Sequence, residues 1–371
     1  MKLVLSWTKV PLHAASPDVH LPLKRSSHSL VVKNGRAFIF GGEDRPREPV
    51  DGELYIVDLQ DGSVSTSASA LKPSARVGLA LASAPLSDAI YLFGGREGSA
   101  MSACSGDLWV YSVAQDEWAQ KSVQESSLGD AVERRSYHAL AATAAGELFL
   151  HAGCPVQGRL GDLHALATGG DPTSTSLSTP LEWTPKPPAP GPGRGGTVLC
   201  PVALPTGQTV LVRYGGFAGH ELGGSIDFFD VAADAWRSIE LEGNGGRGGY
   251  PPARSVHALL PIALPGAQTD DSGAGRVVAL MLFGERGPAP AHLGHMGAGQ
   301  FHADAWALVY YGERASGMFG FEEIKWEGEA PAARGWFAAG AWEGGKVVVH
   351  GGLSDSNERF DDCWIGEVLV Q

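Results

Sequence analysis

Six copies of one short pattern, an apolar segment that ends in glycine, run through this chain of 371 residues and limit how it can fold. The final glycines of the copies are Gly42, Gly95, Gly153, Gly216, Gly284 and Gly352. Ahead of each copy an arginine opens another apolar segment, and these arginines are Arg25, Arg76, Arg135, Arg194, Arg254 and Arg334. A glycine directly after a strand predicts a tight turn. Units of a few short strands cannot bury their apolar faces alone, so the copies must pack on one another.

A third apolar segment follows each glycine, and a fourth that contains tryptophan follows in four copies. Those tryptophans are Trp118, Trp183, Trp236 and Trp326. The last copy ends before any fourth segment, whereas residues 5–10 form a strand that belongs to no copy. We predict that residues 5–10 pair with residues 363–368 and complete the last blade, which removes exposed strand edges. The pattern predicts one all-β domain over residues 1–371, a six-bladed β-propeller whose ring is closed by the N-terminal strand.

The order of diglycine, aromatic strand and tryptophan, at a period of about fifty to sixty residues, resembles the kelch repeat. The resemblance covers essentially the whole chain and implies a kelch β-propeller. The composition agrees, because 51 glycines and 24 prolines supply many tight turns.

The charge balance narrows the range of partners. The chain has 28 basic and 41 acidic residues, a net charge of −13, and no block of Lys and Arg. Nucleic acids and anionic membranes need clustered positive charge, so neither is an expected partner. The N-terminal apolar run is too short for a signal peptide, and no apolar span is long enough to cross a membrane. Four cysteines without CxxC spacing predict free thiols in a reducing compartment, and we expect a soluble cytoplasmic protein.

One loop concentrates residue types that bind metals. It follows the fifth copy and presents Glu285, His292 and His295 within eleven residues that are rich in glycine and proline. Carboxylate and neutral imidazole are ligands for Fe(II), Mn(II) or Zn(II), and two histidines with one carboxylate are a known set for non-haem Fe(II). A surface loop without metal is the alternative interpretation of the same residues.

The topology predicts where a pocket lies. Neighbouring strands of a blade are antiparallel, so the six arginines and the six loops after the glycines meet at one mouth of the central channel. We expect Arg96, Tyr137 and Trp336 at this mouth, in one cavity with Glu285. Six guanidiniums would favour an anionic ligand. Because the arginine recurs in every copy, a structural role within the blades is the competing interpretation.

Several segments together resemble the plant specifier proteins, a group of nitrile specifier, epithiospecifier and thiocyanate-forming proteins with fungal relatives. The segments are Arg76-Val77-Gly78 before Phe93-Gly94-Gly95-Arg96, Arg194-Gly195-Gly196 before Tyr214-Gly215-Gly216-Phe217, Ala253-Arg254-Ser255-Val256, Phe283-Gly284-Glu285 with His295-Met296-Gly297-Ala298-Gly299-Gln300, Arg334-Gly335-Trp336, and His350-Gly351-Gly352 before Asn357-Glu358-Arg359-Phe360-Asp361-Asp362. The resemblance implies binding of Fe(II) and conversion of glucosinolate aglucones, which are thiohydroximate O-sulfates, to nitriles and related products.

The same resemblance assigns residues to roles. Glu285 and His295 are similar to the Glu and the His of the family's iron motif. The Asp between them is missing, Ala291 stands four residues before His295, and His292 is the nearest substitute. Arg96, Tyr137 and Trp336 match the family's substrate contacts, with Tyr where the family has Phe.

These observations favour an Fe(II)-dependent enzyme of lyase or isomerase type that converts a small, anionic substrate such as a glucosinolate aglucone to nitrile-type products. The alternative is a non-catalytic kelch module that binds a protein partner at the channel mouth. A minor alternative is a sugar-handling propeller similar to a sialic acid mutarotase.

Overall fold

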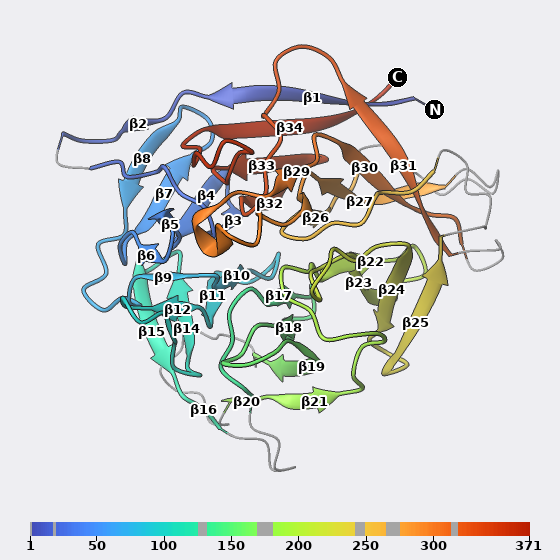
Figure 1. Ribbon diagram of the computed structural model, residues 1–371, viewed down its shortest axis with the longest axis horizontal. Coiled ribbons are helices and arrows are strands. Elements are labelled where there is room, and N and C mark those ends of the chain that lie inside the picture. Colours follow the sequence, from blue (N-terminus) through green and yellow to red (C-terminus); the bar gives the residue numbers. More distant parts are fainter. Residues whose placement is uncertain are drawn as a thin grey trace. The chain divides into compact units, whose positions relative to one another are not determined.

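Short apolar segments become strands throughout the part of the chain that the computed structural model describes, residues 2–17, 20–124, 132–168, 181–241, 249–264, 275–312 and 318–371 (Figure 1). The chain divides into unit 1, which holds Met1–Val10 and Thr197–Gln371, and unit 2, which holds Pro11–Gly196. Within the described residues the regular structure is strand apart from one short 3-10 helix, η1 (Gly294–Met296).

Unit 2 contains three antiparallel arrangements of four strands in which neighbours along the chain pair with each other, and the first has β2 (His13–Ala14) as a fifth strand at its edge. The strands of the first sheet are β3 (Ser29–Lys33), β4 (Arg36–Phe40), β7 (Leu54–Asp58) and β8 (Ser63–Thr66). Those of the second are β10 (Ala80–Ala82), β11 (Ala89–Phe93), β14 (Leu108–Ser112) and β15 (Glu117–Lys121). Those of the third are β17 (Ala139–Ala142), β18 (Glu147–Gly153), β19 (Leu160–Ala167) and β21 (Thr184–Lys186).

Unit 1 also contains three arrangements of four strands. The strands of its first sheet are β22 (Cys200–Ala203), β23 (Thr209–Arg213), β24 (Ser225–Asp230) and β25 (Ala235–Glu240). Those of the second are β26 (Ala258–Pro261), β27 (Arg276–Leu282), β30 (Ala305–Tyr310) and β31 (Phe319–Trp326). Those of the third are β32 (Ala338–Trp342), β33 (Lys346–His350), β34 (Cys363–Val370) and β1 (Leu3–Val10). The described residues therefore make six four-stranded meanders, three in each unit.

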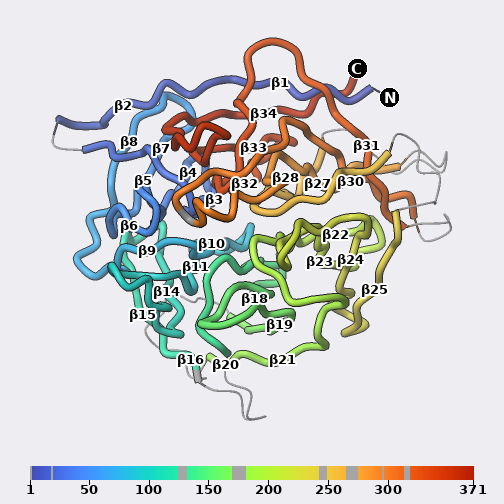
Figure 2. Tube along the Cα trace, in the orientation of Figure 1, coloured from blue at the N-terminus to red at the C-terminus, as the bar shows by residue number. Residues whose placement is uncertain are grey.

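The N-terminal strand is the fourth strand of the last sheet, as predicted. β1 pairs antiparallel with β34 in a register that runs from Leu3 opposite Val370 to Val10 opposite Cys363. Figures 1 and 2 show the two strands side by side, with both ends of the chain at the same end of the pair. On its other edge β1 also pairs in parallel with β31, and this second pairing joins two meanders into one eight-stranded sheet.

Apolar residues on the faces of the sheets form the cores. Inner strands such as β11 and β27 are buried along nearly their whole length, because both faces of each strand pack against neighbouring sheets. One cluster in unit 2 joins β4, β11 and β14, with Trp118 against Tyr111 at 5.2 Å between ring centroids. In unit 1, Trp7 of β1 stacks on Phe283 at 6.2 Å, so the N-terminal strand contributes to the core.

Short ladders extend the sheets at the ends where the glycines lie. They are built from β5 (Glu43–Arg45), β6 (Glu48–Pro49), β9 (Arg76–Val77), β12 (Arg96–Glu97) and β13 (Ser102–Ala103) in unit 2, and from β28 (Glu285–Gly287) and β29 (Gln300–Phe301) in unit 1. Unit 2 also has the parallel pairs β2 (His13–Ala14) with β8, and β16 (Val123–Gln124) with β20 (Leu181–Glu182).

All four cysteines are free thiols, as predicted. In the described ranges, no helix is both long and apolar enough to cross a membrane.

Candidate functional site

The repeated glycines link each sheet to the next through backbone hydrogen bonds. In five of the six copies the N–H of the final glycine donates to the carbonyl of the next repeat arginine along the chain. The pairs are Gly42 to Arg76 (2.9 Å), Gly95 to Arg135 (2.9 Å) and Gly153 to Arg194 (2.8 Å) in unit 2, and Gly216 to Arg254 (2.8 Å) and Gly284 to Arg334 (3.0 Å) in unit 1. A Cβ at Gly94, one residue earlier, would lie 2.6 Å from the carbonyl oxygen of Arg135, so this close approach needs glycine.

The six repeat arginines serve the framework. Their exposed fractions lie between 0% and 6%, and the guanidiniums bond inside their own sheets. Three of them form bidentate pairs, Arg135 with Asp162, Arg254 with Asp304 and Arg334 with Asp362. These arginines also donate to the carbonyls that precede the final glycines. This supports the structural interpretation of the repeat arginines over an anion-binding ring.

The residue two positions after each arginine has a left-handed backbone. The φ values are 58° at Ser27, 64° at Gly78, 53° at Tyr137, 60° at Gly196, 43° at Val256 and 58° at Trp336. This conformation is costly for bulky and β-branched residues, so the surroundings must impose it. Backbone hydrogen bonds support it, since four of these six residues donate their N–H to the carbonyl of the equivalent residue in the preceding sheet. The bonds are Gly78 to Ser27 (2.9 Å), Tyr137 to Gly78 (2.7 Å), Gly196 to Tyr137 (2.9 Å) and Trp336 to Val256 (3.2 Å).

Glu285 occupies the first position of β28, directly after Gly284, and its backbone exchanges two hydrogen bonds with Ser255, at 2.8 and 3.1 Å. The residue is 6% exposed. Burial, strengthened by the negative charge of Glu221, raises the pKa of Glu285 to about 8, and a hydrogen bond from the Trp336 side chain opposes this shift. The only donor on a tryptophan side chain is its indole N–H. The structure thus brings together Glu285 and Trp336, two of the residues that the sequence predicts at one site.

Gly299 makes room for this carboxylate. A Cβ added at Gly299 would overlap the Oε1 atom of Glu285 and the carbonyl of Gly287. The φ of Gly299 is not in the left-handed region, so contact alone accounts for glycine at this position.

Glu221 contributes a further carboxylate with buried oxygens to this site, and the sequence pattern did not predict it. It lies five residues after Gly216, in the loop of unit 1 that forms a bridge between Phe217 and Glu221. Burial raises the pKa of Glu221 to about 7, and the nearby hydroxyl of Ser255 opposes this shift. Neither carboxylate oxygen is exposed, and neither makes a hydrogen bond of normal geometry with the described residues. Its place in a post-glycine loop was the available signal.

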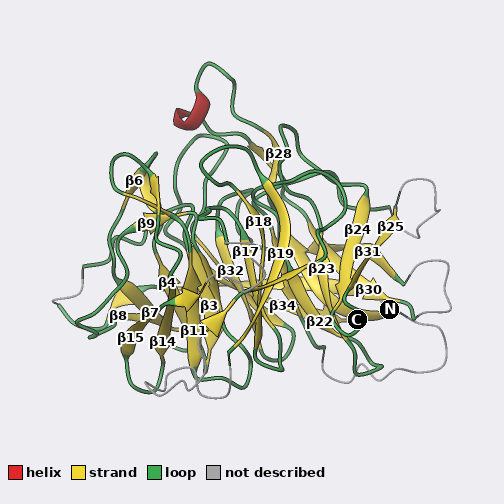
Figure 3. Ribbon diagram, turned by 90° about the horizontal axis from the view of Figure 1, so that it is seen from below, coloured by secondary structure: helices red, strands yellow, loops and turns green. Residues whose placement is uncertain are grey.

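The two predicted histidines lie farther along the same loop. His292 is exposed, and His295 belongs to η1, with a side chain outside the described residues. Figure 3 shows η1 standing away from the sheets, on the side of unit 1 where β28 lies. Among the described side chains, no group of three His, Cys, Asp or Glu residues is arranged to hold one metal ion. The ligand set of Glu285, His292 and His295 therefore stays a prediction.

Arg96 and Tyr137 belong to unit 2. The guanidinium of Arg96 donates to the hydroxyl of Ser136 (3.0 Å) and to the carbonyls of Met101 (3.2 Å), Cys154 (3.3 Å) and Pro155 (2.6 Å). An arginine has five N–H donors, so one is left for a ligand. The ring of Tyr137 packs on Gly78, and burial raises the pKa of its hydroxyl. The predicted cavity that joins these two residues to Glu285 and Trp336 stays a prediction.

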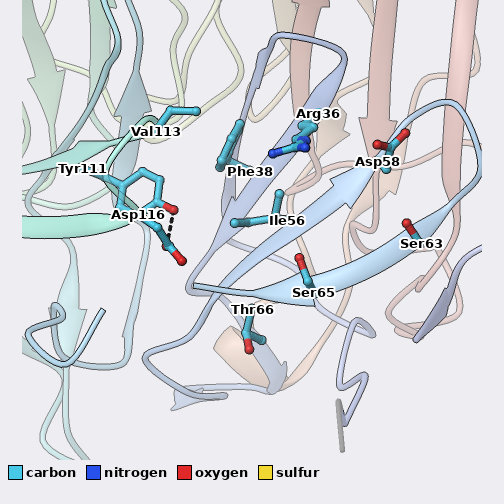
Figure 4. A pocket seen from close by; sticks show the side chains of 10 residues that line it. All are labelled: Arg36, Phe38, Ile56, Asp58, Ser63, Ser65, Thr66, Tyr111, Val113 and Asp116. Atoms are coloured by element: carbon cyan, nitrogen blue, oxygen red, sulfur yellow. Dashed lines mark hydrogen bonds between the residues drawn. The ribbon is translucent and has the colours of Figure 1, made fainter. Parts of the chain in front are cut away.

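A cavity of about 260 Å³ lies elsewhere in unit 2, between β4, β7, β8 and β14 (Figure 4). Arg36 and Asp58 line one part of it, and Tyr111 donates a hydrogen bond of 2.6 Å to Asp116 in another part. Arg36, at the start of β4, lies at the end of that strand farthest from the glycines. The cavity includes none of the predicted site residues.

Comparison with known proteins identifies what the chain is similar to. Residues 20–263 match the family described as the KLHDC2/KLHL20/DRC7 kelch-repeats domain. The chain is 24% identical over 391 aligned positions to the N-(sulfonatooxy)prop-2-enimidothioate sulfolyase of Thlaspi arvense, with 96% of this chain and 95% of the relative covered. A solved structure titled "Structure of YjhT" superposes with a TM-score of 0.61 at 13% identity, and covers 95% of this chain and 99% of its own. The structural likeness supports the fold alone.

Proposed function

The chain belongs to the kelch-repeat family, and on that premise we propose that it is a specifier-type, Fe(II)-dependent lyase acting on a small anionic substrate. The substrate class is an N-sulfonatooxy imidothioate, the chemical class in the name of the Thlaspi arvense relative. Sulfate leaves with the electron pair of the N–O bond, the carbon–sulfur bond breaks, and a nitrile and sulfur remain. The reducing cytoplasm, where the four free thiols persist, is the proposed location.

The observation that carries this proposal is the buried carboxylate of Glu285, which receives the Trp336 hydrogen bond at the head of the predicted metal loop. A buried carboxylate is costly unless it is paired or binds a metal. Among the described residues no Lys or Arg forms an ion pair with Glu285. Its most direct electrostatic neighbour is Glu221, another carboxylate. A divalent cation beside the two carboxylates would allow both of them to ionise.

The residues present fit a divalent metal. The orphaned oxygens of Glu221 and the carboxylate of Glu285 are hard donors of the kind that Fe(II) accepts, and a histidine would complete a three-ligand set with open positions. We propose Glu285 and His295 as ligands, with His292 as the third. When bound, Fe(II) supplies a Lewis acid that attracts the substrate sulfur.

The protein's own residues position the substrate in this proposal. Trp336 orients Glu285 through its indole N–H and offers an aromatic wall, and Tyr137 is the proposed second wall. Arg96 is the proposed partner of the sulfate, through the one N–H that its four protein bonds leave available. Because the substrate is already unstable at its N–O bond, the main contribution of the protein is to position it.

An anaerobic product assay tests the proposal. A glucosinolate aglucone is released in the assay by a thioglucosidase, with Fe(II) and the full-length protein, and the nitrile fraction is measured by gas chromatography. We expect the wild type to raise the nitrile fraction above that of the unassisted reaction, and Glu285→Gln to lose at least about 90% of this effect. The exposed Glu329→Gln, also in unit 1, is the control and should match the wild type. A wild type that leaves the product ratio unchanged contradicts the proposal.

One observation favours the second candidate, a non-catalytic module that binds a protein partner. Leu293 and Met296 at η1 are 43% and 63% exposed, and large apolar side chains at a loop tip are suited to protein contacts. A protein partner would lose affinity with Leu293→Ser and Met296→Ser, whereas the Glu285→Gln variant would bind it as the wild type does.

A further inference from the structure

The backbone of unit 1 brings two glutamates to opposite sides of one short segment. Leu222, next to Glu221, accepts a hydrogen bond of 2.9 Å from the N–H of Arg254. The following residue, Ser255, exchanges hydrogen bonds of 2.8 and 3.1 Å with Glu285. Glu221 and Glu285 are 64 residues apart in the sequence and come from loops of different sheets, yet both flank this Arg254–Ser255 segment.

Both carboxylates are buried at this place. Glu285 is 6% exposed, and both oxygens of Glu221 are inaccessible to solvent and make no hydrogen bond among the described residues. No ion pair to either glutamate occurs within the described ranges. Buried charges in proteins are paired or coordinate metals, and like charges repel, so a cation beside these two carboxylates would allow both to ionise.

The surroundings hold the Glu285 carboxylate in one orientation. Gly299 has no side chain where the Oε1 atom of Glu285 lies against its backbone, and the Trp336 hydrogen bond fixes the carboxylate from another direction. A carboxylate that is oriented by an outer hydrogen bond is typical of metal-binding residues.

We propose that Glu221 and Glu285 together bind one divalent cation, with Glu221 as the second carboxylate of the site. This inference deepens the proposed function and rests on it for the identity of the site, but cation binding is measured separately from catalysis. Two carboxylates neutralise the charge of a divalent ion. They leave coordination positions for water and for an anionic ligand, as at many Mg²⁺ and Mn²⁺ sites.

The test uses Mn²⁺, which is stable in air and has an electron paramagnetic resonance signal when free in water. The full-length protein is stripped with EDTA, dialysed and titrated, and the loss of the free-ion signal gives the bound fraction. We expect one Mn²⁺ per chain for the wild type. Glu221→Gln and Glu285→Gln should each raise the Kd by at least about tenfold, and Glu329→Gln should leave it unchanged. Replacing a buried charge by a neutral amide should leave the fold intact, and a thermal melt of each variant checks this.

The outcomes separate this inference from the proposed function. If both Gln variants weaken Mn²⁺ binding but the wild type does not change the aglucone products, the cation site is upheld and the lyase is rejected. Binding that is lost in Glu285→Gln but unchanged in Glu221→Gln would overturn the role of Glu221. A wild type that binds no Mn²⁺ at millimolar concentration would overturn the inference altogether.

Discussion

Replacing Glu285 by Gln should stabilise the metal-free protein, and more so as the pH rises. The ordinary pKa of a glutamate is 4.5, whereas burial raises that of Glu285 to about 8. Below pH 4.5 the carboxyl is protonated in the folded and the unfolded chain alike. Between pH 4.5 and 8 the unfolded chain loses this proton first, so the wild type loses stability as the pH rises. The amide of Gln does not ionise, and the variant escapes this loss.

The size of the effect follows from the difference between the two pKa values. At about 1.4 kcal/mol for each tenfold change in proton affinity, pKa values of 4.5 and about 8 correspond to about 5 kcal/mol. Glu221 ionises in the same pH range, and water that enters the site relieves part of the cost of ionising Glu285 in the folded protein. We therefore expect about 2–3 kcal/mol at pH 8.5, which is a rise in Tm on the order of 5 °C for a protein of this size.

Thermal melts in EDTA at pH 5.0, 6.5, 7.5 and 8.5 measure this difference. The gap in Tm between Glu285→Gln and the wild type should widen steadily with pH, and Glu329→Gln should follow the wild type throughout. A gap of equal size at pH 5.0 and pH 8.5 would refute the reasoning, because it would place the ionisation of Glu285 outside this range. Addition of Mn²⁺ should narrow the gap by stabilising the wild type alone.

Three further changes test other parts of the structure. Gly299→Ala should lower the Tm, because the new methyl group overlaps the Glu285 carboxylate at a cost of about 1–3 kcal/mol. In a protein that already carries Glu285→Ala, thermal melts should show that Gly299→Ala no longer has this cost. Deletion of β1 should cost several kcal/mol because it removes a paired strand and the burial of its apolar residues, and a truncated protein that melts like the parent would contradict the pairing. Arg135→Lys loses the bidentate bond to Asp162 and should lower the free energy of unfolding by about 2 kcal/mol. Urea denaturation measures this change, and an unchanged midpoint would show that Arg135 does not stabilise the fold.

The sequence predicts the repeat well because the strands are short and each copy carries its own glycine and arginine. The pairing of the N-terminal strand with the last sheet follows from counting, since one copy lacks a strand and one strand lacks a copy. The second, parallel pairing of β1 with β31 was not predicted. This pairing requires the free edges of two sheets to lie side by side, and the apolar pattern of neither strand encodes that.

The site was predicted in part. Glu285 is identified by residue type and Trp336 by its repeat position, and the two are in contact in the structure. The spacing of residues along the chain does not predict Glu221, because its place near Glu285 depends on backbone hydrogen bonds to the Arg254–Ser255 segment. The left-handed backbone of Val256 was not foreseen either, since β-branched residues normally avoid positive φ and only the hydrogen bonds to neighbouring sheets reveal the reason.

The left-handed residues after the repeat arginines also bear on how such a protein can change in evolution. The hydrogen bonds that join one sheet to the next at this position use only the main chain, and every amino acid except proline can supply them. Serine, tyrosine, valine, tryptophan and glycine occupy equivalent places here, and each donates or accepts in this set of main-chain bonds. The side chain at this position can therefore change in each repeat while the main-chain bonds between the sheets are kept. A protein of this kind can acquire new ligands without a change of fold.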